Sequence, residues 1–581
     1  MQKTWLVQQL PEKSEVIRLQ EELKVPQLIS QLLLQRGITT FEAARSFFRP
    51  DLSDLHDPFL MKDMQEAVER LETVKKNKEK ILVFGDYDVD GTTAVALMSL
   101  FLKHADFIFE YYIPDRYKEG YGISIDGIDY AKKQECKLII ALDCGITAVD
   151  KIDYAKELGI DFIICDHHLP GKKVPNAIVL DPKQNDCAYP YKELSGCGIG
   201  FKLAQAYIQK MKLSTDFLYG LLDLVAIAIA ADIVPVTGEN RILAYYGLEL
   251  INSKNQRKGL QALLKSANKE STLTLTNVVF ILAPRINAAG RIDSGKNAVE
   301  LLLSEENSQL NALSEKIEQD NALRKELDRD ITEEILEQSL EIEHFEKRNT
   351  TVVYGENWHK GVIGIVASRI METYYRPTVI LTSSGESASG SVRSVSGFNV
   401  YEALEKCSSL LIQFGGHAAA AGLSIELKNI PAFIEKFEQV VSESISKEQL
   451  VRKERIDAEI SFKDIFSENE TPNKIPKIKR LLNEFEPTGP GNMKPVFLAK
   501  NIYIDPDNSR VVGDNHYKMS LYQADSPYKI PAIGFNLGYK INELGNGEPV
   551  DIIFTLEENT WQERTTLQLN VKDIRPTLVP C

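Results

Sequence analysis

Residues Ile81 to Ala94 read ILVFGDYDVDGTTA, and this stretch decides how the rest of the chain is interpreted. An apolar run comes first, three carboxylates follow at alternate positions, and an apolar-periodic segment comes last, which predicts a strand, a tight acidic turn and a helix. The carboxylates are Asp86, Asp88 and Asp90. Carboxylates this close repel one another, so their place after a buried strand indicates a hard divalent cation. Taken alone, a solvated acidic turn that caps a helix is the simpler alternative.

The composition is that of an ordinary globular protein, because 43% of the 581 residues are hydrophobic and 26% are charged. The length predicts three or four domains. The N-terminal sequence lacks the features of a signal peptide and no apolar run is long enough to span a membrane, so we expect a cytoplasmic protein. Seven cysteines without a CxxC pair predict reduced core residues. The formal charge of −15 means that any contact with nucleic acid needs a locally positive region or bound metal ions.

Short β-branched runs alternate with helical segments after the acidic turn. The strands are ILVFG, FIFEYYIP, LIIAL, DFIIC and AIVLD. This alternation predicts an α/β fold with a doubly wound parallel sheet, which binds ligands beyond the carboxyl ends of its strands. We place this domain at residues 63–303, after an N-terminal extension of residues 1–62 that ends in a linker, RPDLSDLHDP.

Carboxylates and imidazoles recur directly after apolar runs. Asp143 follows LIIAL, and Asp232 follows LVAIAIAA. Asp166, His167 and His168 follow DFIIC. Each has a simple alternative as a helix cap or a surface histidine, but several at equivalent positions predict one ligand set. Oxygen and imidazole ligands without thiolate suit Mg²⁺ or Mn²⁺, and the carboxylates suffice to bridge two ions.

The remainder of the chain divides into three parts. Residues 304–348 are charged, free of glycine and proline, and apolar at intervals of three and four, which predicts a long amphipathic connecting helix. Residues 349–450 begin with strand, loop and helix patterns that predict a second α/β domain. Residues 451–581 contain short, regularly spaced strands, which predict a small β-barrel.

The motifs DYDVDG, DCG and DHH, followed by Asp232, resemble in order and spacing those of the DHH phosphoesterase superfamily. Within it, the chain is similar to the exonucleases that are specific for single-stranded DNA. The resemblance extends almost to the C-terminus and includes IPDRYKEGYG, LSGCGIGFKL, LDLVAIAIAADIVPVTGENRIL, PRINAAGRID, KGVIGIVASR, SGSVRSVSGFNV and GGHAAAAG. It implies a DHH domain, a DHH-associated substrate-binding domain at residues 349–450, and an OB-fold nucleic-acid-binding barrel at residues 451–581.

The resemblance also implies two divalent cations, Mn²⁺ or Mg²⁺, with Asp143 between them. The implied ligands are Asp86, Asp88, Asp143, His167 and Asp232. Asp90 is expected to cap a helix or to orient a ligand, and Asp166 is expected to orient the two histidines rather than to contact metal. His168 is implied to lie beside the scissile phosphate, so that His168 and Asp143 are the expected catalytic residues.

Three arginines in family motifs, Arg116, Arg285 and Arg393, are expected to bind phosphate, although a lone arginine more often forms a surface ion pair. Asn287 is expected in the same group. Ser391 with Arg393 resembles the family's pocket for a 5′-terminal phosphate, which implies degradation from 5′ to 3′.

The glycine-rich motif GGHAAAAG carries His417, which we expect to face the metals across a cleft; a tightly packed turn and helix is the alternative. His359 is a weaker candidate of the same kind. In the barrel, base stacking is expected of Tyr517, Tyr522, Phe535 and Trp561, although aromatic residues of small barrels often belong to the core. The basic run KIPKIKR is either part of the strand's path or solvated.

The expected function is a 5′-to-3′ exonuclease specific for single-stranded DNA that hydrolyses phosphodiester bonds with two metal ions in repair and recombination. The expected partners are single-stranded DNA, single-strand-binding protein and a RecQ-type helicase, with no membrane, and a monomer is expected. One alternative is a DHH-type phosphodiesterase acting on short oligonucleotides or dinucleotides, whose members usually lack the barrel. Another is a non-catalytic replication or repair scaffold, which predicts eroded ligands, whereas here the set is intact.

Overall fold

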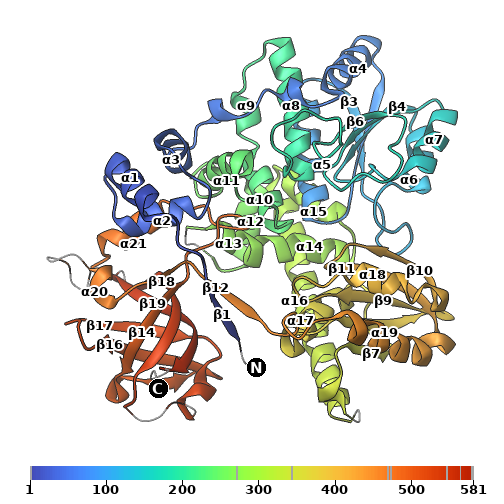
Figure 1. Cartoon of the computed structure of the whole chain (residues 1–581). Coiled ribbons are helices and arrows are strands. Elements are labelled where there is room, and N and C mark those ends of the chain that lie inside the picture. The colour runs from blue at the N-terminus through green and yellow to red at the C-terminus, as the bar shows by residue number, and fades with distance from the viewer. Residues whose placement is uncertain are drawn as a thin grey trace.

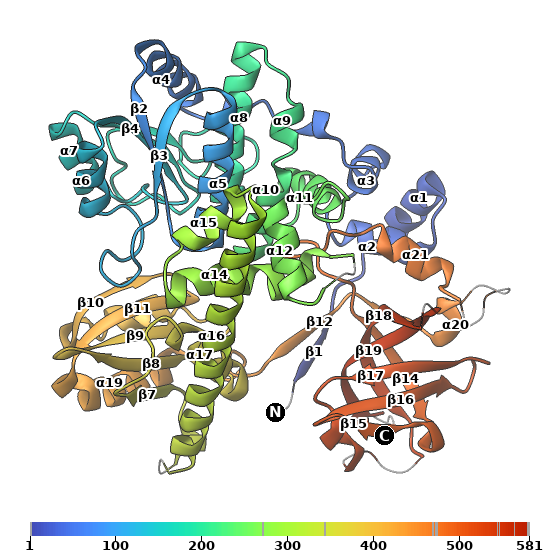
Figure 2. The same cartoon turned by 180° about the vertical axis from the view of Figure 1, so that it is seen from behind.

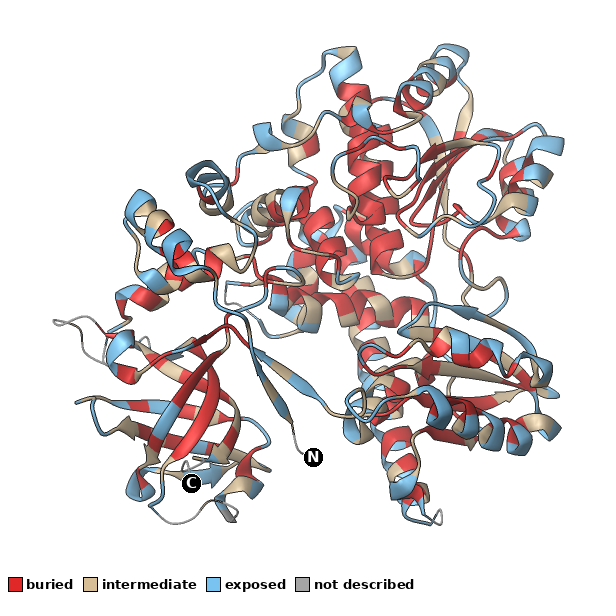
Figure 3. Cartoon of the chain, in the orientation of Figure 1, coloured by how far each residue is buried: buried red, intermediate tan, exposed pale blue. Residues whose placement is uncertain are grey.

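The computed structural model describes residues 3–269, 272–341, 344–466, 470, 474–542, 544, 547–562 and 564–577. Figure 1 shows a parallel-sheet domain, a second α/β domain and a C-terminal barrel, and Figure 2 shows the same arrangement from behind. The buried residues concentrate in the helices and strands at the centre of the parallel-sheet domain (Figure 3).

The first domain is built on a five-stranded parallel sheet in the order β3-β2-β4-β5-β6. The strands are β2 (Lys80–Gly85), β3 (Ile108–Tyr112), β4 (Cys136–Leu142), β5 (Asp161–Cys165) and β6 (Ile178–Leu180). One face carries α4 (Met64–Asn77), α5 (Val89–His104) and α8 (Gly196–Met211), and the other carries α6 (Ile125–Lys133) and α7 (Val149–Glu157). Helices cover both faces, so the central strands are apolar throughout. The prediction of a doubly wound sheet is confirmed.

The domain continues in a helical half. Its elements are α9 (Asp216–Tyr219), α10 (Leu222–Ala231), α11 (Gly238–Ile251), α12 (Lys258–Ser266), α13 (Leu275–Asn277), the π-helical turn η3 (Val278–Leu282), α14 (Ala283–Ile292) and α15 (Lys296–Leu303). The apolar run before Asp232 forms helix α10. Because residues 222–230 of α10 are all buried, the run has no polar face and its helical period is hidden.

The connecting helix α16 spans Asn307–Glu341, within the predicted 304–348. It packs against α12, α14 and α15 of the first domain and against α17 (Ile363–Tyr374) of the second. Figure 2 shows α16 running alongside both domains, as expected of a strut.

The second domain has a mixed sheet in the order β10-β11-β9-β8-β7. The strands are β7 (Thr351–Gly355), β8 (Thr378–Ser384), β9 (Ser387–Arg393), β10 (Leu411–Gly416) and β11 (Ala420–Glu426), with helices α18 (Val400–Glu405) and α19 (Ile430–Ser444). The motif GGHAAAAG is not a turn and helix, because it forms the tight connection of the antiparallel pair β10 and β11. Its small residues permit close pairing, with Gly415 opposite Gly422.

Among its described residues, the C-terminal barrel has seven strands in the order β13-β14-β18-β19-β17-β16-β15, and β14 also pairs with β16. The strands are β13 (Ala458–Glu459), β14 (Phe497–Ile504), β15 (Arg510–Val512), β16 (His516–Gln523), β17 (Lys529–Gly534), β18 (Val550–Trp561) and β19 (Arg564–Pro576). The helices α20 (Phe462–Ile465) and α21 (Lys477–Asn483) precede β14. The predicted β-barrel is confirmed.

Residues 1–62 are not a separate extension over the part that the structure describes. Strand β1 (Thr4–Val7) pairs in parallel with β12 (Lys453–Ile456), and we call this pair the ribbon. Helices α1 (Lys13–Leu23), α2 (Gln27–Leu34) and α3 (Phe41–Phe48) share a hydrophobic core with the barrel. The predicted linker contains the short helices η1 (Leu52–Asp54) and η2 (Pro58–Leu60), which pack on the first domain. Among the described residues, no helix has the length and apolar character needed to cross a membrane.

Candidate active site

The acidic turn after β2 places two of the predicted ligands. Asp88 caps α5, where its Oδ1 accepts a hydrogen bond of 3.0 Å from the Gly91 N–H. Asp86 Oδ1 accepts a bond of 3.2 Å from the Gly122 N–H, while its Oδ2 is buried without a hydrogen-bond partner among the described residues. Position 91 needs glycine, since a Cβ there would lie 2.7 Å from the Asp86 nitrogen.

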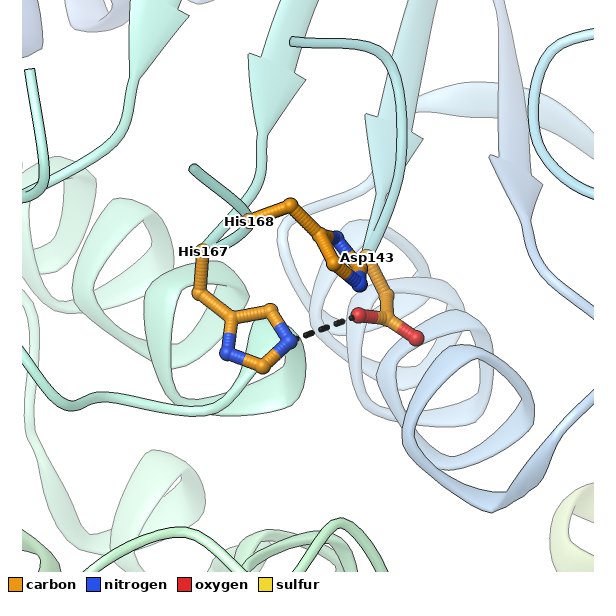
Figure 4. A group of neighbouring side chains, drawn as sticks. All are labelled: Asp143, His167 and His168. Atoms are coloured by element: carbon orange, nitrogen blue, oxygen red, sulfur yellow. Dashed lines mark ion pairs between the residues drawn. The ribbon is translucent and has the colours of Figure 1, made fainter. Parts of the chain in front are cut away.

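Side chains from three further elements converge beside this turn. Asp143 follows β4, His167 follows β5 and Asp232 ends α10. His167 Nε2 lies 3.2 Å from Asp143 Oδ1 and 3.5 Å from Asp232 Oδ2. Figure 4 shows His167 and His168 directed towards Asp143. Two backbone outliers adjoin the ligands, because Asp143 and the β-branched Ile233 have φ angles of +60° and +58°. Such strain is typical of functional sites.

The ligand set fits divalent cations. Burial lowers the pKa of His167, so its ring is neutral near pH 7. Neither ring nitrogen of His167 has a hydrogen-bond partner among the described residues, and the same holds for the buried Oδ1 of Asp143. Because buried polar atoms are normally paired, an imidazole nitrogen and a carboxylate oxygen that lie 3.2 Å apart without forming a hydrogen bond fit a bound cation.

The pKa values of the carboxyl groups also indicate a cation site. Burial, together with neighbouring carboxylates, raises the pKa of Asp86 and of Asp143 well above the usual range. Burial and the nearby Asp88 raise the pKa of Asp232 to about 7. Repulsion of this kind is relieved when a cation binds between the groups. The number of ligand groups suffices for two cations.

The remaining acids of the motifs orient their neighbours. Both oxygens of Asp90 accept backbone hydrogen bonds of 2.7 Å, from Gly196 and Cys197 at the start of α8. Asp90 also lies 3.9 Å from His167 Nε2, but its oxygens are already engaged. Asp166 Oδ1 accepts a bond of 2.7 Å from His168 Nδ1, and its Oδ2 accepts one of 2.9 Å from the Ile146 N–H. This geometry is the one expected of orienting residues.

His168 faces the cleft between the two α/β domains. Although burial opposes it, the hydrogen bond with Asp166 raises the pKa of His168 to about 9. Its Nε2 lies 3.3 Å from the Tyr121 hydroxyl, and its ring is parallel to that of His417 at 6.4 Å. A cavity of about 620 Å³ lies here, and it is lined by His168, His417, Tyr121, Asp166 and the loop after β4. The second domain therefore supplies His417 to this cavity, beside His168.

Three guanidinium groups form a second cluster, which we call the arginine pocket: Arg116, Arg291 and Arg393. None of the three has an ion pair with a carboxylate of the described residues. Arg393 donates to Ser391 at 3.1 Å and to Ser368 at 3.0 Å, and Arg116 lies over the Tyr87 ring at 3.9 Å. Burial and the charges of the other two arginines lower the pKa of Arg291 to about 10. Unpaired guanidinium groups held together fit an anion such as a phosphate group.

Three family models match the chain: the DHH family, N-terminal domain, at residues 80–229, the DHHA1 domain at residues 348–443, and the RecJ OB domain at residues 456–573. The chain is 36% identical to the single-stranded-DNA-specific exonuclease RecJ of Bacillus subtilis, over 98% of this chain and 70% of that protein. It is 31% identical to RecJ of Salmonella typhimurium, over 95% of this chain and 96% of that protein.

The chain belongs to the RecJ family. The crystal structure of RecJ from Thermus thermophilus in complex with Mn²⁺ has the same fold, with a TM-score of 0.83 and 26% identity over 99% of this chain and 80% of that one. A crystal structure of exonuclease RecJ bound to manganese matches with a TM-score of 0.60 and 30% identity, over 69% of this chain and all of that one. The resemblance found in the motifs is confirmed, as are the fold class, the class of enzyme and the use of Mn²⁺ or Mg²⁺.

Within the RecJ motif PRINAAGR, the structure places Arg291 in the arginine pocket, whereas the sequence predicted Arg285. Arg285 does not face the cleft, because its side chain is buried and forms two hydrogen bonds with Glu318 of α16, at 2.6 and 3.2 Å. Arg291 occupies the position in the arginine pocket that was expected of Arg285. Arg285 and Arg291 are six residues apart, and on a helix residues at this spacing lie on different faces. The spacing therefore indicated that only one of them could face the cleft. Asn287, between them, has a buried Oδ1 without a partner among the described residues and stays a candidate.

The aromatic candidates of the OB domain separate by exposure. Tyr517 is buried in the barrel core, and Tyr522 stacks on Tyr503 at 5.4 Å. Phe535 is 54% exposed, whereas the side chain of Trp561 lies outside the described residues. The basic run KIPKIKR enters α21, where Lys479 is nearly buried beside Glu558 at 3.6 Å. His359 contacts the Tyr117 ring edge-on at 6.0 Å, beside the arginine pocket rather than the metals.

Proposed function

We propose that this chain removes nucleotides from the 5′ end of single-stranded DNA by metal-dependent hydrolysis. The observation that carries the proposal is the convergence of Asp143, His167 and Asp232 from three elements on one point, with His167 Nε2 at 3.2 and 3.5 Å from the two carboxylates. Family membership supports the class of substrate, since the curated relatives are named as single-stranded-DNA-specific exonucleases.

Asp86, Asp88, Asp143, His167 and Asp232 would hold the cations. When bound, two divalent cations stabilise charge on the scissile phosphate and acidify an attacking water molecule. The protein's own groups position the strand and move protons. His168 is held by Asp166 with its Nε2 towards the cleft, where it can donate a proton to the departing 3′-oxygen or bind a phosphate oxygen.

The arginine pocket supports the polarity. It presents three guanidinium groups and the Ser391 hydroxyl beside the acidic turn, since Asp88 is among the charges that act on Arg291. A terminal phosphate monoester carries more charge than an internal diester and offers three oxygens, so it is the group that such a pocket favours. Placing the 5′-phosphate there leaves the next phosphodiester for the metal centre, and each cycle would release a mononucleotide.

The test compares four substrates in the presence of Mn²⁺: single strands with a 5′-phosphate, with a 5′-hydroxyl, or with a blocked 5′ end, and a blunt duplex. We expect rapid release of mononucleotides from the 5′-phosphorylated strand, slower release from the 5′-hydroxyl strand, and little from the other two. Asp143→Ala should abolish cleavage. Equal attack on the duplex, or degradation that begins at the 3′ end, would contradict the proposal.

A phosphodiesterase for dinucleotides is the second candidate, and the cavity of about 620 Å³ lined by His168 and His417 would admit such a substrate. The same assay with a dinucleotide separates the two, because the first candidate predicts a strong preference for longer strands. Single-strand-binding protein and a RecQ-type helicase as partners, a cytoplasmic location and a monomeric state remain proposals, supported by the class of enzyme.

A further inference from the structure

Ile233 is an exposed apolar side chain beside the metal centre. It directly follows the predicted ligand Asp232 at the end of α10, and 64% of its surface is exposed. Val234 and Val236 are buried, so the chain turns these two residues inwards and Ile233 outwards. A single exposed apolar residue needs no special explanation. The backbone conformation of Ile233 does need one.

Ile233 has the left-handed conformation, with a φ angle of +58°. Residues that follow a helix often have this conformation, but glycine or asparagine is usual there. Of the described non-glycine residues with a positive φ, Ile233 is the only β-branched one. Isoleucine lowers the stability at this position in two ways, because its Cβ substituents crowd the backbone and because its side chain stays exposed to water. A contact with a bound molecule explains why an apolar side chain occupies this place.

The charges around the two ends of the metal centre show on which side of the cut Ile233 lies. Burial raises the pKa of Asp86, and the positive charge of Arg116 in the arginine pocket opposes that shift. Burial raises the pKa of Asp232 too, but there Lys183 opposes the shift, and no arginine of the pocket is among the described groups that act. Ile233 therefore lies at the end of the metal centre away from the arginine pocket. With the 5′-phosphate in that pocket and the scissile phosphodiester at the metals, the second nucleotide of the strand comes next, at this end.

The loop that carries Ile233 is held in place by hydrogen bonds on its far side. The carbonyl oxygen of Pro235 accepts a hydrogen bond of 3.1 Å from the Tyr191 hydroxyl. The Val236 N–H donates a hydrogen bond of 2.7 Å to the carbonyl oxygen of Pro490, in the segment before the barrel strand β14. Because the loop is fixed at these two residues, a ligand that contacts Ile233 does not have to order it first.

We propose that Ile233 packs against the base of the second nucleotide, the one that follows the scissile phosphodiester. The inference deepens the proposed function and rests on it, because the strand is the substrate of that function. An aliphatic side chain covers the flat face of an unstacked base, and the contact removes apolar surface of both from water. With the 5′-phosphate bound at the other end of the metal centre, this contact holds the scissile phosphate between two fixed points, so that each cut removes one nucleotide.

The test measures binding of three 5′-phosphorylated pentanucleotides in chelator, so that no strand is cut: one intact, one abasic at the second nucleotide and one abasic at the fourth. The variant is Ile233→Asn. Its matched control is Lys212→Asn, because Lys212 is an exposed residue in the same left-handed conformation at the end of α8, with a φ angle of +54°. Since asparagine tolerates this conformation, neither replacement should lower the melting temperature.

We expect Ile233→Asn to weaken binding of the intact strand and of the strand abasic at the fourth nucleotide about tenfold. For the strand abasic at the second nucleotide the change should be less than about twofold, because the base that Ile233 contacts is already missing. Ile233→Val keeps an apolar side chain and should bind the intact strand within about threefold of wild type, and Lys212→Asn should bind all three strands as wild type does. The same tenfold loss is expected in kcat/KM on the intact strand with Mn²⁺.

An equal loss for all three strands would overturn the proposal, because the variant would then act through something other than the second base. Unchanged affinity, a wild-type protein that binds none of the strands, or a melting temperature that falls in Ile233→Asn but not in Lys212→Asn would also overturn it, the last in favour of a role in folding alone. If the wild-type protein binds these strands but cuts none with Mn²⁺, the proposed function fails while the contact is still judged by the binding measurements.

Discussion

The replacement Asp166→Asn tests how the protein controls the proton on His168. The Asp166 carboxylate accepts hydrogen bonds from His168 Nδ1 at 2.7 Å, from the backbone N–H of His167 at 2.8 Å and of His168 at 3.2 Å, and from that of Ile146 at 2.9 Å. Although burial acts to raise it, the hydrogen bond with His168 lowers the pKa of Asp166. Asparagine has the same shape, but it has one acceptor atom in place of two and carries no charge.

Two consequences follow for Asp166→Asn. The amide nitrogen faces a donor, so a buried N–H loses its partner and the free energy of unfolding falls by about 1 to 3 kcal/mol. The imidazole of His168 loses the carboxylate that fixes its tautomer and favours its protonated form. A loss of kcat between about 10² and 10⁴ is expected for a proton-transferring or charge-stabilising group that is misdirected in this way.

The assay is the steady-state release of mononucleotides from a 5′-phosphorylated single strand at saturating Mn²⁺, with unfolding followed in parallel. Asp129→Asn is the control, because Asp129 accepts a hydrogen bond of 2.7 Å from Tyr154 at the exposed surface. His168→Ala and the double variant complete a cycle, in which the two losses should not add, since both act through one imidazole. A kcat for Asp166→Asn within about threefold of wild type, in a folded protein, would refute this reasoning.

Three further predictions concern the arginine pocket, the packing at Asp143 and the metals. Arg291→Ala should raise KM for a 5′-phosphorylated strand at least tenfold and remove the preference for this strand over a 5′-hydroxyl strand. Arg285→Ala should instead lower the free energy of unfolding and leave that preference intact. The reverse pattern would contradict the assignment of Arg291 to the arginine pocket. Gly196→Ala should weaken Mn²⁺ binding in a calorimetric titration, because a Cβ there would lie 2.8 Å from Asp143 Oδ1. Gly198→Ala on the same helix is the control and should leave Mn²⁺ binding unchanged, because the nearest atom to its Cβ lies 3.5 Å away. Mn²⁺ at about a hundred times its Kd should stabilise the fold by about 2.7 kcal/mol in a thermal unfolding assay, and His167→Ala should abolish most of that gain; an equal gain in both proteins would count against His167 as a ligand.

The parallel-sheet domain could be predicted from sequence because its strands and the carboxylates that follow them are visible in short stretches of sequence. Buried parallel strands are short and apolar, and carboxylates that follow them must meet at one edge of the sheet. Asp86, Asp143 and His167 are found together for this reason. Asp232 comes from the end of helix α10, whose type the sequence left open, because a helix buried on every side has the same composition as a buried strand.

Other features depend on long-range packing that periodicity does not reveal. The helices of residues 1–62 complete the barrel core across more than four hundred positions of sequence, since Leu32 and Phe485 belong to one cluster. The choice of Arg291 over Arg285 for the arginine pocket depends on the position of Glu318 on α16, which removes Arg285 from the cleft.

The most direct test of the metal centre is anomalous diffraction at the manganese edge from crystals of this protein soaked in Mn²⁺. The account predicts two strong peaks at the carboxyl edge of the parallel sheet, one or both at about 2.1 Å from Asp143 oxygens and one within the same distance of His167 Nε2. Peaks that lie elsewhere, or a site that binds Mn²⁺ equally well in Asp143→Ala, would contradict it.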